Sequence, residues 1–238
     1  MFSQVQKDLY NLANPEKARI LARFFKTGKG EYGEGDRFLG IMIGPVQELA
    51  RKYKDLSFSD LQKLLNGVYH EERTLAVMIL IRQYEKGERV KREEIFKFYL
   101  KNTNKINNWD LVDISAPKII GESLGDKDIK ILGEGRKILY KLAKSENLWE
   151  RRIAIMSTFA FIRNSDFTDT LKIAEILLTD KHDLIHKAVG WMLREIGKKD
   201  QKAEEVFLKK HYRTMPRTML RYAIEKFSQK QREFYLAS

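Results

Sequence analysis

The sequence predicts an all-α protein, and three observations support that prediction. Apolar residues recur at helical spacing over long stretches, and only four prolines interrupt the 238-residue chain. No segment shows the alternation of apolar and polar residues that a half-buried strand requires. Segments of similar pattern also return about every 35 to 40 residues. With 238 residues, 43% of them hydrophobic, the chain is long enough for one sizeable core, and composition allows one domain, two domains or a single elongated array. We predict a single helical domain over residues 1–238.

The first helices are predicted from their boundary residues. The pair Asn14-Pro15 is typical of a helix N-cap followed by proline at the first helical position, and it predicts a helix to about residue 25. Ser59 is expected to cap the next helix, which carries three leucines. A further helix over 71–85 is expected to end at Gly87, because glycine favours helix C-termini.

The rest of the chain continues with helices of the same apolar spacing. We expect them over residues 92–103, 109–123, 129–145, 149–163, 167–178, 183–197, 201–211 and 216–227.

An internal repeat underlies these helices. The segments EERTLAVMI (71–79), WERRIAIMS (149–157) and LIHKAVGWM (184–192) each begin a helix with a basic residue before an apolar run. DLVDISAPK (110–118) fits between the first two. The aligned positions are Arg73, Val112, Arg151 and His186, spaced by 39, 39 and 35 residues. Periods near 40 with two helices per period predict a HEAT-like solenoid with a concave surface.

The repeat also predicts which residues are neighbours. Asp113 and Arg152 each follow an aligned position by one residue, so we expect them side by side on successive inner helices. Trp109 lies one helical turn before Asp113, and Trp191 lies one turn after Lys187. These residues are therefore predicted to share one patch of the concave wall.

The charge of the chain favours a polyanionic partner. Forty-five Lys and Arg residues against 33 Asp and Glu give a net charge of +12, which suits nucleic acid. The alternative is a basic surface that serves only solubility. No apolar run approaches the roughly 20 residues of a membrane span, and the N-terminus lacks the layout of a signal peptide. With no cysteine, the chain fits a reducing interior, and we predict a cytoplasmic protein.

At this point the residues resemble a known family, the AlkD-like alkylpurine DNA glycosylases. The similarity lies in NNWDLVD with the following Pro117, in NLWERRIAI (147–155) and in KAVGWMLRE (187–195). NPEKARILARFF (14–25) and FLGI (38–41) resemble the N-terminal segments of that family. The resemblance spans nearly the whole chain in the right order. It implies a HEAT-like solenoid whose basic concave groove holds double-stranded DNA, and removal of N3- and N7-alkylated purines without a metal or cofactor.

The resemblance also assigns roles to individual residues. The catalytic aspartate of the family falls on Asp113 and its catalytic-site arginine on Arg152. The two site tryptophans fall on Trp109 and Trp191. A tyrosine that helps to hold the lesion in some members falls on Phe24, which keeps the ring but lacks the hydroxyl.

Three further positions concern DNA affinity. Relatives often carry a basic residue where this chain has Met42, just after FLGI. Lys187 and Arg194 are candidates to line the groove and contact phosphates, which predicts that affinity falls steeply with salt. We expect a monomer without an obligate protein partner.

The chemistry suits these residue types. An N3- or N7-alkylated purine is cationic and leaves as a neutral base, so the reaction leaves a sugar with oxocarbenium character. Asp113 can stabilise that sugar and orient water, while indole faces attract cations by about 0.5–2 kcal/mol each. Arg152 would hold a backbone phosphate and Asp113 in place.

Each of these residues also has a purely structural explanation. Asp113 beside a packed Trp109 could serve only the helix start, and a helical tryptophan such as Trp191 is more often core than ligand platform. Trp149 is predicted to be such a packing residue. For the whole chain, the alternatives to an enzyme are a non-catalytic module that binds DNA structure and a protein-interaction scaffold.

One apparent metal motif is rejected. The histidines of HDLIH (182–186) have the spacing of a zinc-binding pair. Asp183 is expected to cap that helix and leave His182 outside it, so we predict no metal site.

Overall fold

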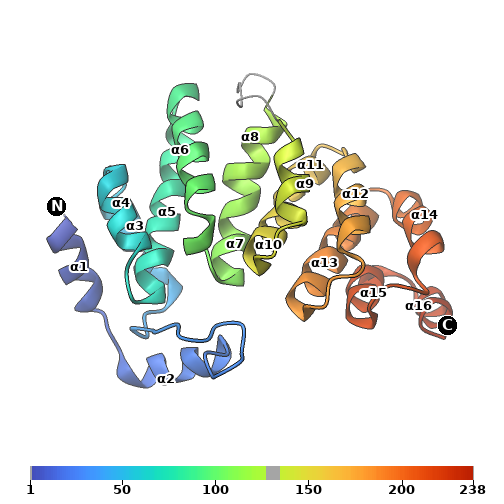
Figure 1. Cartoon of the computed structure of the whole chain (residues 1–238), viewed down its shortest axis with the longest axis horizontal. Helices are drawn as coiled ribbons and strands as arrows, with labels where there is room; N and C mark the ends of the chain where they lie inside the picture. Colours follow the sequence, from blue (N-terminus) through green and yellow to red (C-terminus); the bar gives the residue numbers. More distant parts are fainter. Residues whose placement is uncertain (1, 127–134, 238) are drawn as a thin grey trace. The chain divides into compact units, whose positions relative to one another are not determined.

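The protein is described by a computed structural model that covers residues 2–126 and 135–237 (Figure 1). Within these residues the chain is helical, and its β pairing is an isolated bridge between Arg37 and Tyr69. The all-α prediction is therefore confirmed. The chain divides into two compact units, Met1–Leu111 (the first unit) and Val112–Ser238 (the second unit). The predicted single solenoid over 1–238 stays a prediction.

The first unit consists of helices arranged around one buried helix. In chain order these are α1 (Phe2–Tyr10), α2 (Pro15–Phe24), α3 (Ile43–Lys52), α4 (Phe58–Leu65), α5 (His70–Lys86), α6 (Arg89–Lys101) and the 3-10 turn Thr103–Lys105. Helix α5 is buried over nearly its whole length, because α3, α4 and α6 pack around it. Its apolar residues include Leu75, Ile79 and Leu80, all fully buried, so it forms the core of this unit.

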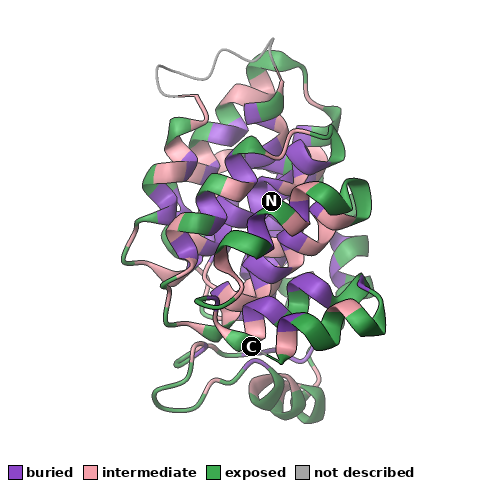
Figure 2. Ribbon diagram, turned by 90° about the vertical axis from the view of Figure 1, so that its right-hand side faces the viewer, coloured by how far each residue is buried: buried purple, intermediate pink, exposed green. Residues whose placement is uncertain are grey.

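Helix α2 differs from its neighbours because none of its residues is buried (Figures 1 and 2). Asn14 caps it through a side-chain bond from Lys17 N, and Pro15 occupies its first position, as predicted. The segment after α2 returns to the cap, where Asn14 N donates to Leu39 O. Gly40 allows this approach, since it has φ +83° and a Cβ there would lie 2.0 Å from Asn14 O.

The second unit is built mainly around two inner helices, α10 and α13, and the helices that flank them. Its elements are the π-helical turn Ala116–Gly121, α8 (Glu122–Gly125), α9 (Lys137–Ala143), α10 (Leu148–Ser157), α11 (Phe159–Arg163), α12 (Thr168–Leu177), α13 (Asp183–Lys199), α14 (Gln201–His211), α15 (Arg217–Ala223), the 3-10 turn Ile224–Lys226 and α16 (Gln229–Leu236). Helix α10 packs on α9 and α13, and α13 packs on α14 and α15. Gly190 lets α13 and α15 approach, because a Cβ there would lie 2.4 Å from Met219 O.

The predicted helix over 109–123 changes its geometry midway. Helix α7 (Trp109–Ser115) spans the division between the units and is followed directly by the π-helical turn Ala116–Gly121. Pro117 lies in that turn and lacks an N–H donor, which explains why the α-helical bonding pattern widens there. Asp113 therefore sits on the last regular turn before an irregularity.

The hydrogen bonds of the aligned positions confirm the repeat. Arg73 Nη1 donates to Gly67 O, Arg151 Nη1 donates to Ser145 O, and the His186 ring bonds Asp180 O. In all three cases the carbonyl lies six residues before the aligned residue, so each basic side chain closes the loop that precedes its own helix. Val112, the apolar member of the series, is fully buried.

Several boundary predictions were wrong. The cap of α4 is Ser57, whose side chain accepts from Asp60 N, and Ser59 lies inside the helix. Gly87, in contrast, ends α5 as predicted, with φ −75°. Helices α1, α3 and α16 were not predicted. For the predicted helix 129–145, residues 129–134 lie outside the described residues.

The cap of α13 was also assigned to the wrong residue. His182 is the N-cap, since its Nδ1 accepts from Leu184 N, and Asp183 lies in the first turn. Trp149 is buried near the start of α10, as predicted. No helix in the described ranges is both long and apolar enough to cross a membrane.

Candidate functional site

The aspartate and arginine predicted to be neighbours form a two-point ion pair in the second unit. Arg152 on α10 donates from Nε to Asp113 Oδ1 and from Nη2 to Asp113 Oδ2, each at 2.8 Å. Its third nitrogen, Nη1, donates to Leu184 O at the start of α13. One guanidinium thus links three successive segments of the repeat, and the predicted adjacency of Asp113 and Arg152 is confirmed.

The two partners differ in exposure. The side chain of Arg152 is 5% exposed and that of Asp113 is 15% exposed. A planar guanidinium that binds both oxygens fixes the rotation of the carboxylate. The geometry therefore presents a partly exposed carboxylate in one orientation, while the arginine itself offers little surface to a phosphate.

Trp191 lies on α13 in the same unit and is partly exposed. Its indole N–H donates to Glu195 Oε1 at 3.0 Å, one turn further along the helix. Lys198 Nζ donates to the same oxygen at 2.7 Å, which fixes the carboxylate in turn. Glu195 was not predicted, although its i, i+4 spacing from a helical tryptophan is a usable signal.

The two basic candidates of this unit already have acidic partners. Lys187 Nζ lies 2.7 Å from Asp183 Oδ2, and the lysine side chain is 40% exposed. Arg194 pairs with Glu225 and lies near Glu195, and its side chain is mostly buried. An added anion would have to compete with two carboxylates at Arg194, and Arg194 is also the more buried of the two side chains.

Trp109 and Phe24 lie in the first unit, in a cluster of rings. Trp109 stacks on Phe25 with ring centroids 5.3 Å apart, and Phe24 meets its edge at 5.9 Å. The indole N–H of Trp109 donates to Tyr32 Oη at 3.2 Å. Phe24 is 61% exposed, so its ring is available at the surface. That these rings share one patch with Asp113, Arg152 and Trp191 stays a prediction.

A buried charged network that the sequence did not predict lies behind this cluster. His70 Nε2 bonds Asp110 Oδ2 at 2.8 Å, and its Nδ1 lies 3.5 Å from Asp36 Oδ2. Asp36 also bonds Arg73 and accepts from Asn108 Nδ2. No local signal could have revealed the network, because Asp36 reaches its partners from a loop more than 30 residues away in the chain.

The charges of this network are set by its hydrogen bonds. Burial alone would lower the pKa of His70, but the bonds to Asp110 and Asp36 outweigh it and raise that pKa to about 9. Burial alone would raise the pKa of Asp36, but the neighbouring imidazolium and Arg73 hold it below its ordinary value. At neutral pH, His70 is therefore a buried cation between two carboxylates.

Among the described residues, no group of three or more His, Asp or Glu side chains is arranged to hold a metal ion. The two histidines of HDLIH are engaged with backbone atoms, His182 with Leu184 N and His186 with Asp180 O.

Comparisons with known proteins agree with this architecture. The sequence model of the family described as DNA alkylation repair enzyme matches residues 5–227. No curated protein sequence matches the chain. A solved structure described as a predicted DNA alkylation repair enzyme from Enterococcus faecalis superposes with a TM-score of 0.68 at 17% identity, over 91% of this chain and 97% of that one. At that identity the superposition shows a shared helical repeat fold.

Proposed function

The chain belongs to the DNA alkylation repair enzyme family, and from that premise we propose that it is a monofunctional DNA glycosylase. A role in DNA repair follows from the family. The proposed reaction is hydrolysis of the N-glycosidic bond of N3- or N7-alkylated purines in duplex DNA, which leaves an abasic site.

The observation that carries the proposal is the ion pair between Asp113 and Arg152. The departing base of such a lesion is already cationic, so the step needs stabilisation of a positive sugar more than it needs a general acid. A carboxylate held in one orientation and partly exposed supplies that stabilisation, and it can also orient the attacking water. Each carboxylate oxygen accepts one bond from Arg152, and the two bonds together hold the carboxylate in that orientation.

Arg152 is proposed to position Asp113 rather than to hold a phosphate. Two of its three nitrogens bind the carboxylate, the third binds Leu184 O, and its side chain is almost fully buried. The phosphate contact expected from the sequence would require the guanidinium to leave these partners. Lys187 is proposed for phosphate contact instead.

The tryptophans are proposed to contact the lesion nucleotide. The faces of both indoles attract a cationic base and a cationic sugar, at about 0.5–2 kcal/mol each. The N–H of Trp109 donates to Tyr32 and that of Trp191 donates to Glu195, so each indole ring is held in one orientation. Phe24, exposed beside Trp109, is proposed to extend that contact.

We also propose that the enzyme acts in the cytoplasm as a monomer. The absence of cysteine from the sequence suits a reducing compartment. Light scattering after size-exclusion chromatography measures the oligomeric state directly, and a dimer mass would contradict the proposal.

The decisive experiment is release of 7-methylguanine from a defined duplex by the wild type and by Asp113→Asn. Removing one preorganised electrostatic group typically costs about 10²- to 10³-fold in rate, and we expect a loss of that order with DNA binding unchanged. Asp180→Asn is the matched control, because Asp180 pairs with Arg151, the residue before Arg152 on the same helix. Equal losses in both variants would mean that Asp113 acts only through the fold. If the wild type binds the duplex but releases no base, the protein is a non-catalytic DNA-binding module for this substrate.

A further inference from the structure

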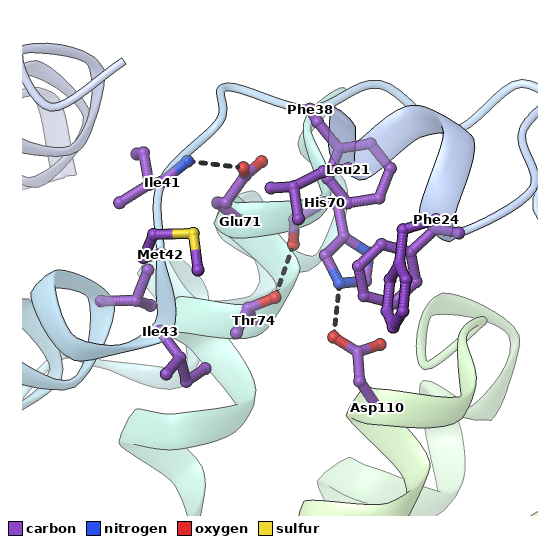
Figure 3. A pocket seen from close by; sticks show the side chains of 12 residues that line it. Leu21, Phe24, Phe38, Ile41, Met42, Ile43, His70, Glu71, Thr74 and Asp110 are labelled. Atoms are coloured by element: carbon purple, nitrogen blue, oxygen red, sulfur yellow. Dashed lines mark hydrogen bonds and ion pairs between the residues drawn. The ribbon is translucent and has the colours of Figure 1, made fainter. Parts of the chain in front are cut away.

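The buried cation of the first unit, His70, has no part in the reaction proposed above. Its side chain is only 4% exposed. The ring of Phe38 stacks on it with centroids 4.8 Å apart, and the ring of Phe25 lies against it at 5.1 Å. Figure 3 shows the imidazole directed at the carboxylate of Asp110, in the first turn of α7. The position of this ring therefore bears on the start of α7.

Trp109 is connected to His70 through ring packing. The indole stacks on Phe25 with centroids 5.3 Å apart and an angle of 23° between the ring planes. Phe25 is itself buried, with 7% of its surface exposed. One phenyl ring thus contacts both the buried cation and the indole, so a shift of the imidazole would be passed on to Trp109.

The backbone on both sides of Trp109 is held by the same histidine. Asp110, the next residue, lies with its Oδ2 atom 2.8 Å from His70 Nε2. Asn108, the preceding residue, is fully buried; its Oδ1 accepts from Trp109 N at 2.9 Å and its Nδ2 donates to Asp36 Oδ2 at 3.2 Å. That same Asp36 oxygen lies 3.5 Å from His70 Nδ1. The two nitrogens of one imidazole therefore support the residues before and after the tryptophan.

The charges around His70 balance only while it is protonated. It is faced by Asp110 from α7, by Asp36 from the preceding loop and by Arg73 from its own helix. Glu71, also on α5, is engaged with three backbone N–H groups, and the α2 residues that line the adjoining cavity are apolar. Burial lowers the pKa of His70, but the bonds to the two aspartates outweigh it and raise that pKa to about 9.

Packing alone does not fix these side chains. A cavity of about 180 Å³ adjoins Phe25, His70 and Asp110, so they lack close neighbours on that side. A neutral imidazole has a single N–H and can donate to only one of the two aspartates. The other carboxylate would then be left with a weaker set of partners in a buried place, which is costly. Loss of the proton should therefore let the rings shift toward the cavity.

We propose that His70 is a positioning residue for lesion binding, and that its protonated ring holds Trp109 in the orientation that receives the cationic nucleotide. The inference rests on the proposed function for the role of Trp109. An indole face attracts the cationic lesion before the reaction and the cationic sugar during it. Misplacing that face should consequently raise KM and leave kcat nearly unchanged.

The first experiment follows the three tryptophans of the full chain by ¹⁹F NMR after labelling with 5-fluorotryptophan. The Trp109 signal is assigned by its absence from the spectrum of Trp109→Phe. We expect it to shift with a midpoint near pH 9, together with the ring proton of one of the four histidines, while the signals of Trp149 and Trp191 stay constant. A Trp109 signal that does not respond overturns the proposal, as does a shift common to all three tryptophans, which would report unfolding.

The second experiment compares the same substitution at two histidines. His70→Gln keeps an amide N–H but cannot carry a charge, so the Trp109 signal should lose its titration near pH 9. At a pH near 7.5, its KM for 7-methylguanine in duplex DNA should rise about 3- to 10-fold, with kcat within about twofold of the wild type. His186→Gln is the matched control, because that ring bonds the backbone of Asp180 in the second unit, and it should change neither quantity. If His70→Gln does not fold, the titration of the wild type carries the test.

The two experiments separate the failure of this inference from the failure of the proposed function. A His70→Gln protein that excises 7-methylguanine with the KM of the wild type overturns the positioning role and leaves the glycosylase intact. A wild type that excises nothing, but whose Trp109 signal follows the titration of His70, supports the positioning role and contradicts the glycosylase.

Discussion

Trp109 in the first unit and Trp191 in the second are each anchored through the indole N–H, but their surroundings differ in kind. Trp109 is packed by Phe24 and Phe25 and donates to the neutral hydroxyl of Tyr32. Trp191 donates to Glu195, which also binds Lys198. The first unit therefore fixes its indole by ring packing, and the second fixes it by charge. Ring packing fixes only the position of an indole, whereas a carboxylate that accepts its N–H bond also increases the attraction of the indole face for cations.

The two units also differ in how their buried ionisable groups are partnered. In the first unit, His70 is a cation matched by Asp36 and Asp110. In the second unit, Arg152 is matched by Asp113, but the buried Glu204 has no hydrogen-bond partner for its Oε1. Stability in each unit should thus respond differently to charge removal and to pH.

The largest effect is expected from Arg152→Met, which removes the cation from the pair with Asp113. A mostly buried carboxylate left without its partner should lower the free energy of unfolding by roughly 3–5 kcal/mol, and excision should fall as for Asp113→Asn. Urea unfolding measures the first quantity. Arg163→Met is the control, because the exposed pair with Glu122 should contribute less than about 1 kcal/mol. Equal losses would show that the buried pair is no more important than a surface pair.

The second effect concerns pH and the first unit. His70 has its pKa raised to about 9, so its protonated form is favoured by folding. That stabilisation is fully present below about pH 6.5, the ordinary pKa of histidine, and is lost as the pH rises through 9. We expect the free energy of unfolding to fall by a few kcal/mol between pH 6.5 and 9 on this account. Unfolding of His70→Gln over the same range should show a smaller fall, and an unchanged slope would contradict the assignment.

The third effect concerns pH and the second unit. Burial, together with Glu205, raises the pKa of Glu204 to about 9, so the folded protein keeps a proton that the unfolded chain loses above its ordinary pKa near 4.5. This group therefore destabilises the fold progressively from about pH 4.5 to 9. Relative to the wild type, the free energy of unfolding of Glu204→Gln should rise by a few kcal/mol as the pH increases from 5 to 8. A gain that is independent of pH would point to packing instead of ionisation.

The smallest effects compare the two indole anchors directly. Tyr32→Phe removes the neutral acceptor of Trp109, and Glu195→Gln keeps an acceptor for Trp191 but removes its charge. A hydrogen bond contributes about 0.5–1.5 kcal/mol, so we expect Tyr32→Phe to reduce excision about 2- to 10-fold. Glu195→Gln should raise KM for the cationic lesion with little change in kcat, and the indole N–H proton resonance of Trp191 should shift. If Glu195→Gln moves the resonance but leaves KM unchanged, the carboxylate only orients the ring.

The sequence predicted those features that depend on regular spacing. The 39-residue period alone placed Asp113 beside Arg152, because successive helices of a repeat pack in register. The helices with strong boundary residues, such as Asn14-Pro15, were also predicted. Helix α3 was missed because Gly44 and Pro45 in its first turn look like a loop, although proline is tolerated there.

Features that depend on loops packing against distant residues could not be predicted. Asp36 meets Arg73 and His70 only because the loop before Phe38 folds back onto α5, and no periodic pattern encodes that path. Glu71 appeared to be an ordinary helix-start carboxylate, yet it clamps the backbone of residues 39–41.

The three repeat segments share a bond from a basic side chain to a carbonyl six residues earlier, made by Arg73, Arg151 and His186. This bond affects how the chain folds and how repeats can be gained or lost. Each bond ties a loop to its own helix, so the entry to each segment is stabilised without help from the next one. Contacts so close in sequence form early and with little entropic cost, which favours fast, segment-by-segment folding. Because each loop is held by its own helix, whole repeats can be duplicated or lost during evolution while the neighbouring repeats keep their local structure.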